Sequence, residues 1–172
     1  RCRAPIFVAR QLGKHQAGMS WSEESRRYFT TEPEFYWPDK WRKKAENVKQ
    51  GSSDEEVTDL VDVGKTTPEY DAVFGPRQPV LPQPYVEHWT KQMLHVYNEM
   101  LNSGVAPEQA RMILPQNMMI TWVWTGTLLA WHHMIKERTA PTTQRETQEF
   151  ARMVEQVMNE LYPVSMEALR SY

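Results

Sequence analysis

Apolar residues recur every three or four positions through much of the second half of the chain. From Tyr85 onward this spacing is carried by Val86, Trp89, Met93, Val96, Tyr97 and Met100, and Gly104 follows them. Such a repeat predicts an amphipathic helix with one face in a core, and glycine is the residue that most often ends a helix. A shorter helix is expected over APEQARMIL, which Pro107 opens and Pro115 ends.

Two further helices are predicted closer to the end of the chain. One covers Leu128 to Glu137. The other begins at Thr143, where Glu146 three positions later gives the spacing of a capping box. It is expected to run to Leu161 and to bury Val154, Val157, Met158 and Leu161. Before these helices, MMITWVWT (118–125) is rich in β-branched and aromatic residues, which favours either a strand or a buried helical start.

The first half of the chain has a less regular pattern. Pro5, the apolar residues up to Leu12 and then Gly13 indicate a short helix. Residues 25–31 are a candidate strand, and GSSDEE (51–56) is expected to be a mobile loop. Prolines at positions 76, 79, 82 and 84 suggest an extended connection. The sum is an α+β fold, helix-rich in its second half, with a length of 172 residues that suits a single domain.

Composition and charge exclude several classes of protein and several kinds of site. The net charge of -2 provides no general basic field for a nucleic acid polymer, so any anion must be held by a local cluster. The single cysteine, Cys2, excludes an internal disulfide and a multi-cysteine metal site. This fits a reducing cytosol, and a cytoplasmic location is expected. No apolar run approaches the length of a membrane span.

One polar stretch, GKHQAGMSWSEESRRY (13–28), concentrates many kinds of hydrogen-bonding group. Arg26 and Arg27 beside Ser25 suit a phosphate, because guanidinium groups match phosphate oxygens and a hydroxyl adds a neutral donor. Glu23 offers an acceptor for a sugar hydroxyl or a base N–H. The alternative is an ordinary charged strand edge exposed to solvent, and a plain surface histidine is the alternative for His15.

Other candidates are weaker on spacing alone. Arg111 and Arg138 lie near the ends of apolar helices, where each can turn toward a ligand or only toward solvent. His132 and His133 are adjacent and lack the spacing of a zinc site, so no metal is expected. No phosphate-binding loop, dinucleotide fingerprint or activated-serine motif is present, so the spacing rules offer no nucleophile.

The order of several segments resembles the family of flavin-dependent thymidylate synthases. APIFVARQ stands intact at 4–11, ahead of the position of that family's RHRxxSxNExSxRY signature. Here KHQ replaces RHR, one extra residue follows, and Ser22 stands where the family usually has Asn. This is close to the KHQxGxxxNExSRRY form of phage and some bacterial members. PEFYWPDKWRKKAENVKQGSS, ARMILPQNM and WTGTLLAWHHMIKERTAPTTQRETQEFA extend the similarity over almost the whole chain.

The resemblance implies roles for particular residues. Those expected to bind dUMP are Gln11, Glu23, Ser25, Arg26 through its backbone, Arg27, Arg111 and Arg138, the two last from a neighbouring subunit. Those expected to contact FAD are Lys14, His15, Gln16, Glu23, Thr127 and His133. Ser25 and Arg138 are the expected catalytic residues, with Ser25 holding phosphate or uracil and not attacking.

The resemblance also implies a fold and a reaction. The fold would be that of the thymidylate synthase-complementing proteins, with a small, mostly antiparallel sheet. The reaction would convert dUMP to dTMP, with methylenetetrahydrofolate as one-carbon donor and NADPH reducing the FAD. A homotetramer with shared active sites is expected, in a bacterium or a phage-infected host. The family also carries a segment ahead of APIFVARQ that is expected to be missing here. Two alternatives stay open: a noncatalytic nucleotide-binding relative, and transfer of a hydroxymethyl group to a pyrimidine nucleotide.

Overall fold

The computed structural model describes residues 1–28, 31–46, 51–58 and 81–171. The chain divides into two compact units, each described below by itself. The first contains Arg1–Tyr36, Lys44–Ser52 and Gln116–Tyr172, and the second contains Trp37–Lys43 and Ser53–Pro115. Nearly all of the predicted site residues belong to the first unit.

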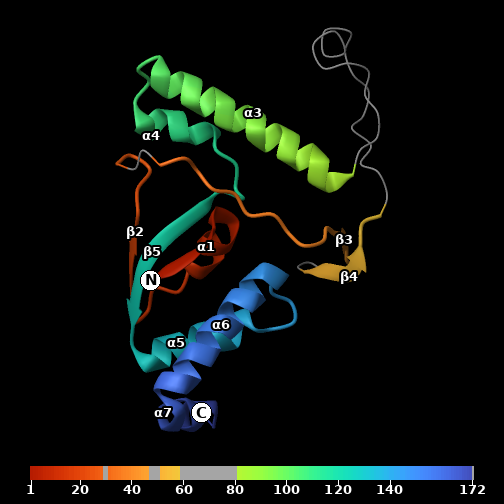
Figure 1. Ribbon diagram of the computed structural model, residues 1–172. Helices are drawn as coiled ribbons and strands as arrows, with labels where there is room; N and C mark the ends of the chain where they lie inside the picture. Colours follow the sequence, from red (N-terminus) through yellow and green to blue (C-terminus); the bar gives the residue numbers. More distant parts are fainter. Residues whose placement is uncertain (29–30, 47–50, 59–80, 172) are drawn as a thin grey trace. The chain divides into compact units, whose positions relative to one another are not determined.

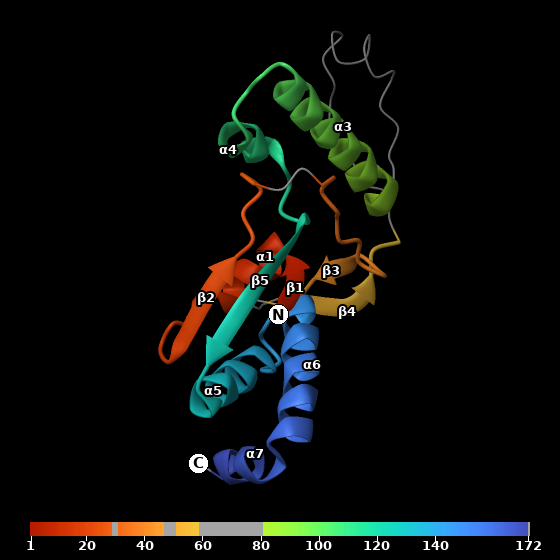
Figure 2. The same cartoon turned by 60° about the vertical axis from the view of Figure 1, so that its left-hand side comes forward.

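A three-stranded antiparallel sheet is the centre of the first unit. Its strands are β1 (Cys2–Pro5), β2 (Met19–Glu23) and β5 (Met119–Gly126), with β5 between the other two. Figure 2 shows β5 running beside β2, with α5 following directly from its end. Every second residue of β5 is buried, which is the alternation of a strand with one covered face. The MMITWVWT stretch is therefore a strand, and the predicted small antiparallel sheet is confirmed.

The described residues of the first unit also form the helices α1 (Ile6–Leu12), α5 (Leu128–Arg138), α6 (Arg145–Leu161) and α7 (Pro163–Arg170). The α6 helix contacts α1, α5 and α7. Trp122 on β5 is fully buried and stacks on Phe150 of α6, with ring centroids 5.7 Å apart. Leu12, Met134 and Met166 are also fully buried. One hydrophobic core thus joins the sheet to its helices. It fixes the positions of α1 and α5, and most of the candidate polar residues lie on these two helices or next to them.

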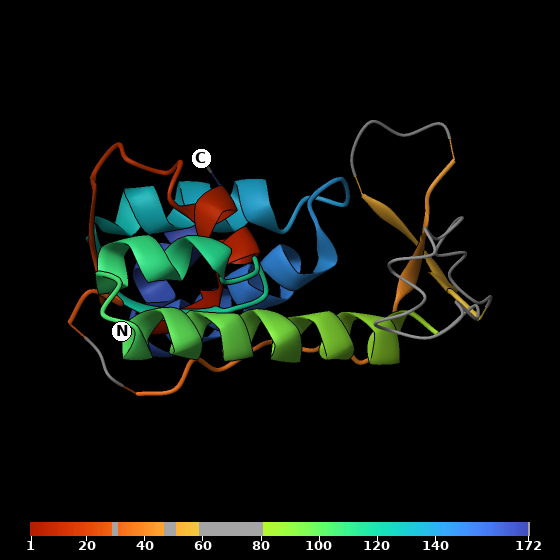
Figure 3. The same ribbon diagram turned by 90° about the horizontal axis from the view of Figure 1, so that it is seen from above.

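The second unit is built around α3 (Pro82–Asn102), the long green helix of Figure 1. The short α4 (Pro107–Ala110) and the 3-10 turn η1 (Arg111–Ile113) pack against it, as Figure 3 shows for α4. Gly104 ends the α3 region with a φ of 84°, a conformation that glycine adopts without strain. The predicted helix from Tyr85 and its glycine stop are thus confirmed. A two-stranded sheet pairs β3 (Arg42–Lys44) with β4 (Ser52–Glu56).

Two predictions in the first half of the chain were wrong. The expected strand at 25–31 is absent from its described part: β2 ends at Glu23, and Arg26 to Tyr28 form a turn. Residues 51–56 were expected to be a loop, but Ser52–Glu56 is strand β4. Its acidic residues lie opposite the basic β3, and Lys43 pairs with Glu55 at 3.3 Å. Opposite charges on paired strands offset the poor strand propensity of Asp and Glu.

The proline and capping predictions also need correction. Pro82 and Pro84 lie in the first turn of α3, where a missing N–H costs little, while Pro76 and Pro79 lie outside the described residues. The capping box at Thr143 does not form, because Gln144 precedes α6 and the Thr143 hydroxyl donates to the Glu137 carbonyl at 3.1 Å.

The predicted core face of α6 is only partly right. Met158 is buried, but Val157 and Leu161 are 51% and 64% exposed. Thr147, Phe150 and Ala151 are buried instead. The buried face of α6 is thus set by its contacts with α1, α5, α7 and Trp122 of β5, and the apolar periodicity at the end of the helix does not identify it. The final helix, α7, was not predicted.

Candidate functional site

His15 and Arg138 meet in the first unit, although 123 positions separate them. His15 lies in the turn after α1, where its backbone N–H donates to the Leu12 carbonyl, and Arg138 is the last residue of α5. The Arg138 Nε–H donates to Nε2 of His15 at 2.8 Å. Burial, followed by the charge of Arg138, lowers the pKa of His15 below its ordinary value of 6.5, against the opposing effect of Glu137. Both causes favour the neutral imidazole, which is the form that can accept this bond.

Gln11 is held at the end of α1 by two acceptors. Its Nε2 donates to Oε1 of Gln144 at 2.6 Å and to the Phe7 carbonyl at 3.4 Å. With the NH₂ group committed in this way, the Gln11 Oε1 atom is the part of the amide that can face a ligand. An amide oxygen accepts hydrogen bonds, so Gln11 is suited to a ligand N–H such as that of a pyrimidine ring.

Glu23, Ser25 and Arg27 gather where β2 passes into the following turn. The Ser25 Oγ accepts from the Arg27 Nε at 3.0 Å and from the Arg27 backbone N–H at 3.4 Å. Arg27 also lies over the Tyr28 ring, with its guanidinium carbon 5.2 Å from the ring centroid. The Ser25 O–H therefore remains able to donate, and beside the exposed guanidinium it makes a suitable pair for an anion.

Trp21 holds the neighbouring carboxylate. Its indole N–H donates to Glu23 Oε2 at 3.3 Å, while its ring stacks on Trp122 at 4.4 Å and meets the edge of Trp124. Glu23 is thus oriented from a rigid aromatic cluster. Trp21 was not among the predicted site residues, although it lies inside the polar stretch that contains them.

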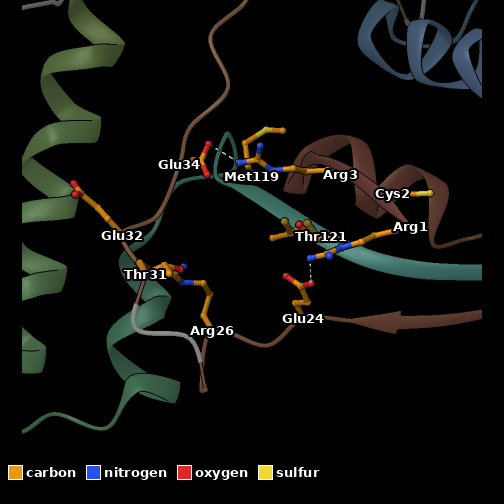
Figure 4. Close-up of a pocket in the computed structure, with 11 residues that line it drawn as sticks. Arg1, Cys2, Arg3, Glu24, Arg26, Thr31, Glu32, Glu34, Met119 and Thr121 are labelled. Atoms are coloured by element: carbon orange, nitrogen blue, oxygen red, sulfur yellow. Dashed lines mark hydrogen bonds and ion pairs between the residues drawn. The ribbon is translucent and has the colours of Figure 1, made fainter.

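Arg26 faces a separate pocket of about 510 Å³ on the first unit, shown in Figure 4. The charged side chains around it are Arg1, Arg3, Glu24, Glu32 and Glu34. Arg26 donates to the Thr31 carbonyl, and its Nε has no partner among the described residues. None of the other predicted dUMP residues lines this pocket. The Arg26 side chain is therefore not part of the Ser25–Arg27 pair. Only the backbone of Arg26 lies near that pair.

Thr127 has a structural role that the sequence did not reveal. Its Oγ1 accepts from the Ala130 N–H at 3.2 Å and caps the N-terminus of α5. Its own N–H donates to the Gly18 carbonyl, so the cap also ties α5 to the start of β2. Because α5 has 11 residues, Thr127 and Arg138 lie roughly 16 Å apart along it.

The remaining flavin candidates are open to solvent. Lys14, Gln16 and His133 are exposed. Lys14 and Gln16 flank His15, so the turn after α1 presents a cation and an amide to any ligand that reaches it. This donor set fits the pyrimidine oxygens and phosphates of a flavin nucleotide.

Arg111 belongs to the second unit. It begins η1, is exposed, and its Nε donates to the Glu108 carbonyl at 3.4 Å. That Arg111 and Arg138 clamp dUMP from a neighbouring subunit remains a prediction.

The structure thus gathers the candidates of the first unit into separate groups. Gln11 pairs with Gln144, which sequence reasoning missed, and His15 pairs with Arg138. Ser25 pairs with Arg27 just after Glu23 in the chain, and Thr127 stands apart at the start of α5. Within the described part of the chain, no cluster of three or more His, Cys, Asp or Glu side chains is arranged for a metal. The helices described there include none with the length and hydropathy needed to cross a membrane.

Comparison with solved structures gives the same fold. The chain aligns with the crystal structure of a UMP/dUMP methylase, PolB from Streptomyces cacaoi, bound with 5-Br dUMP. The TM-score is 0.70 with 26% identity, over 99% of this chain and 68% of that one. The same methylase bound with 5-Br UMP gives a TM-score of 0.72 over 98% of this chain and 71% of that one.

Sequence relatives point to one family. A flavin-dependent thymidylate synthase of Thermus thermophilus is 32% identical over 99% of this chain and 55% of its own length. That of Aquifex aeolicus is 33% identical over 90% of this chain and 43% of its own. The chain therefore spans about half the length of these curated relatives. The family model described as "Thymidylate synthase complementing protein" matches residues 1–164. The chain belongs to the thymidylate synthase complementing protein family.

Proposed function

We propose that the protein methylates dUMP to dTMP as a flavin-dependent thymidylate synthase, with methylenetetrahydrofolate as the carbon donor and NADPH as the reductant. The observation that carries the proposal is the group at the end of β2, where Glu23, Ser25 and Arg27 are held by internal contacts and remain accessible. The names of the curated relatives and the nucleotide analogues bound to the structural neighbour support the same substrate class.

The residues of this chain would bind and orient dUMP. Arg27 and the Ser25 O–H would hold the phosphate, and Gln11 would accept from the pyrimidine N–H. Arg138 would place a fixed positive charge where negative charge develops on the pyrimidine, which lowers the barrier when the group is pre-positioned. The Ser25 Oγ is bonded to the Arg27 guanidinium, which cannot accept a proton, and no general base is among its described contacts, so Ser25 serves as a donor and not as a nucleophile.

The cofactor would be FAD, held by Lys14, His15 and Gln16 in the turn after α1, with Glu23 on the nucleotide side. A bound flavin supplies the hydride transfer that no side chain can perform. The charge of Lys14 and the amide of Gln16 would stabilise negative charge on the ring. Lys14 and Gln16 replace the family's two arginines, so their contacts are less rigid than bidentate ones.

The assembly would be a homotetramer, and the protein would work in the cytoplasm. The family pattern, in which Arg111 and Arg138 reach dUMP from a neighbouring subunit, motivates a shared site.

The proposal is tested with full-length protein reconstituted with FAD. Tritium release from 5-tritiated dUMP should require FAD, methylenetetrahydrofolate and NADPH together, and mass spectrometry should identify dTMP. Tight nucleotide binding without flavin uptake would support a noncatalytic relative instead. A hydroxymethylated product would support the other alternative. UMP should be assayed beside dUMP, because the structural neighbour is described as a methylase of both.

A further inference from the structure

We propose that His15 is a positioning residue for Arg138: as a neutral acceptor, it fixes the guanidinium that the proposed function assigns to dUMP. The inference rests on the proposed function for the identity of the nucleotide. The contact itself rests only on the geometry of the first unit. It gives His15 a role toward the substrate, in addition to the flavin contact expected from the family pattern.

The donor and acceptor atoms define the chemical state of the pair. The bond joins Arg138 Nε–H to His15 Nε2 at 2.8 Å. An arginine Nε–H only donates, so His15 Nε2 must carry a lone pair and no proton. The neutral ring then has its proton on Nδ1. Protonation of Nε2 would remove the acceptor and place two cations in direct contact.

Backbone contacts fix both partners. The His15 N–H donates to the Leu12 carbonyl at 3.0 Å, just after the buried end of α1. Arg138 is followed by Thr139, whose N–H and hydroxyl both donate to the Ile135 carbonyl. Because the bond uses Nε, the two terminal nitrogens of Arg138 remain available to a ligand. A guanidinium anchored through Nε presents its two NH₂ groups to a ligand in one orientation.

The charged groups around His15 determine the pH range in which the His15–Arg138 hydrogen bond can form. Arg138 and Glu137 act on it from α5 with opposite signs, and Lys14 adjoins it in the chain. Burial and Arg138 lower the pKa of His15, so the neutral ring predominates at neutral pH and is lost on acidification. Proper placement of Arg138 should therefore fail at a pH below the pKa of His15.

A double-mutant cycle on dUMP affinity tests the inference. Arg138→Ala should weaken dUMP binding by roughly 30-fold to 900-fold, the loss expected for a charge-assisted contact, and His15→Phe should weaken it about tenfold, because the guanidinium is then present but no longer fixed. The double variant should bind no more weakly than Arg138→Ala alone, because His15 acts through Arg138. If the losses instead multiply, His15 contacts the nucleotide site independently and the inference is overturned.

The pH profile supplies a second readout. The ratio of wild-type to His15→Gln affinity for dUMP should fall as the pH drops from neutral to below the pKa of His15, which is lowered from 6.5, because glutamine keeps an acceptor and does not titrate. Titration of the phosphate cancels in this ratio. His132→Gln is the matched control, since burial also lowers the pKa of His132, while the charges that act on it are those of His133, Lys136, Arg170 and Glu155 and not that of Arg138. A flat ratio for His15→Gln would contradict the inference.

Histidine NMR distinguishes failure of this inference from failure of the proposed function. The His15 ring should show an unprotonated Nε2 and a pKa that rises in Arg138→Gln, which removes the neighbouring charge. This holds whether or not dUMP binds. A protonated Nε2 at neutral pH, or a pKa unaffected by Arg138→Gln, would overturn the pairing. A wild-type protein with the predicted NMR behaviour but without dUMP binding would refute only the nucleotide assignment.

Discussion

The side-chain amides of Gln11 and Gln144, which are 133 positions apart, are joined by a hydrogen bond of 2.6 Å. Gln11 is near the end of α1, and Gln144 immediately precedes α6. The contact fixes which way the Gln11 amide faces, so the acceptor oxygen is available to a ligand.

Replacing Gln144 should therefore impair binding without changing any predicted ligand contact. Gln144→Leu leaves the Gln11 amide free to rotate, and dUMP affinity should fall about threefold to tenfold, the cost of one neutral hydrogen bond. Calorimetric titration with dUMP measures the effect. Gln156→Leu, further along α6, is the control and should bind normally, because Gln156 is exposed and bonds to Glu160. Equal losses in the two variants would show that α6 itself, and not the Gln11 amide, is responsible.

Ser25 and Arg27 should respond differently to truncation. Arg27→Ala removes a fixed positive charge and should weaken dUMP binding by about 2–4 kcal/mol, as expected for a charge-assisted phosphate contact. Ser25→Ala should retain measurable turnover, because the Ser25 Oγ bonds only to Arg27 among the described residues and has no activating base. Complete loss of turnover in Ser25→Ala with dUMP binding intact would indicate a covalent role for the hydroxyl.

The aromatic core should dominate the stability of the first unit. Trp122 is fully buried, stacked between Trp21 and Phe150. Trp122→Ala should lower the free energy of unfolding by about 3–5 kcal/mol through lost burial and a residual cavity. Val123→Ala, at the next position on β5, is the control because Val123 is 53% exposed. Denaturant unfolding should show a much smaller change for that variant.

Gly18 should be intolerant of a side chain. Its φ is +70°, and a Cβ there would lie 3.2 Å from both the Ala130 Cβ and the Thr127 Oγ1. Gly18→Ala should destabilise the protein by at least ~1–2 kcal/mol, the cost of the left-handed conformation for an L-residue. Gly13 has a φ of -63°, so Gly13→Ala should be close to neutral. Thermal unfolding of both variants, measured side by side, checks the difference.

Helices with a regular apolar repeat, or with proline or glycine at their ends, could be predicted from the sequence. The repeat from Val86 and the Gly104 stop located α3, and Pro5 and Gly13 framed α1. The β4 strand could not be predicted, because its stability comes from pairing with the basic β3 and not from its own composition. Likewise Val157 and Leu161 have helical spacing but lie outside the packed face of α6. Local pattern reveals the periodicity of an element, while the packing partners decide which of its residues are buried.

In the candidate site, too, contacts between neighbours in the chain could be predicted, and contacts that depend on helix packing could not. The motif identified Glu23, Ser25 and Arg27, which are neighbours in the chain at the end of β2, and Ser25 and Arg27 are in contact there. It gave no signal that His15 contacts Arg138 or that Gln11 contacts Gln144, since these pairs form only when α1, α5 and α6 pack together. It also did not reveal that Thr127 caps α5.

The central claim is that one protein holds a flavin and dUMP in a shared site. The most direct test is the visible absorption spectrum of the purified full-length protein with added FAD, followed by titration with dUMP. We expect flavin bands that stay with the protein after desalting and shift as dUMP binds. A protein that takes up no FAD, or a flavin spectrum unchanged by saturating dUMP, would contradict the account.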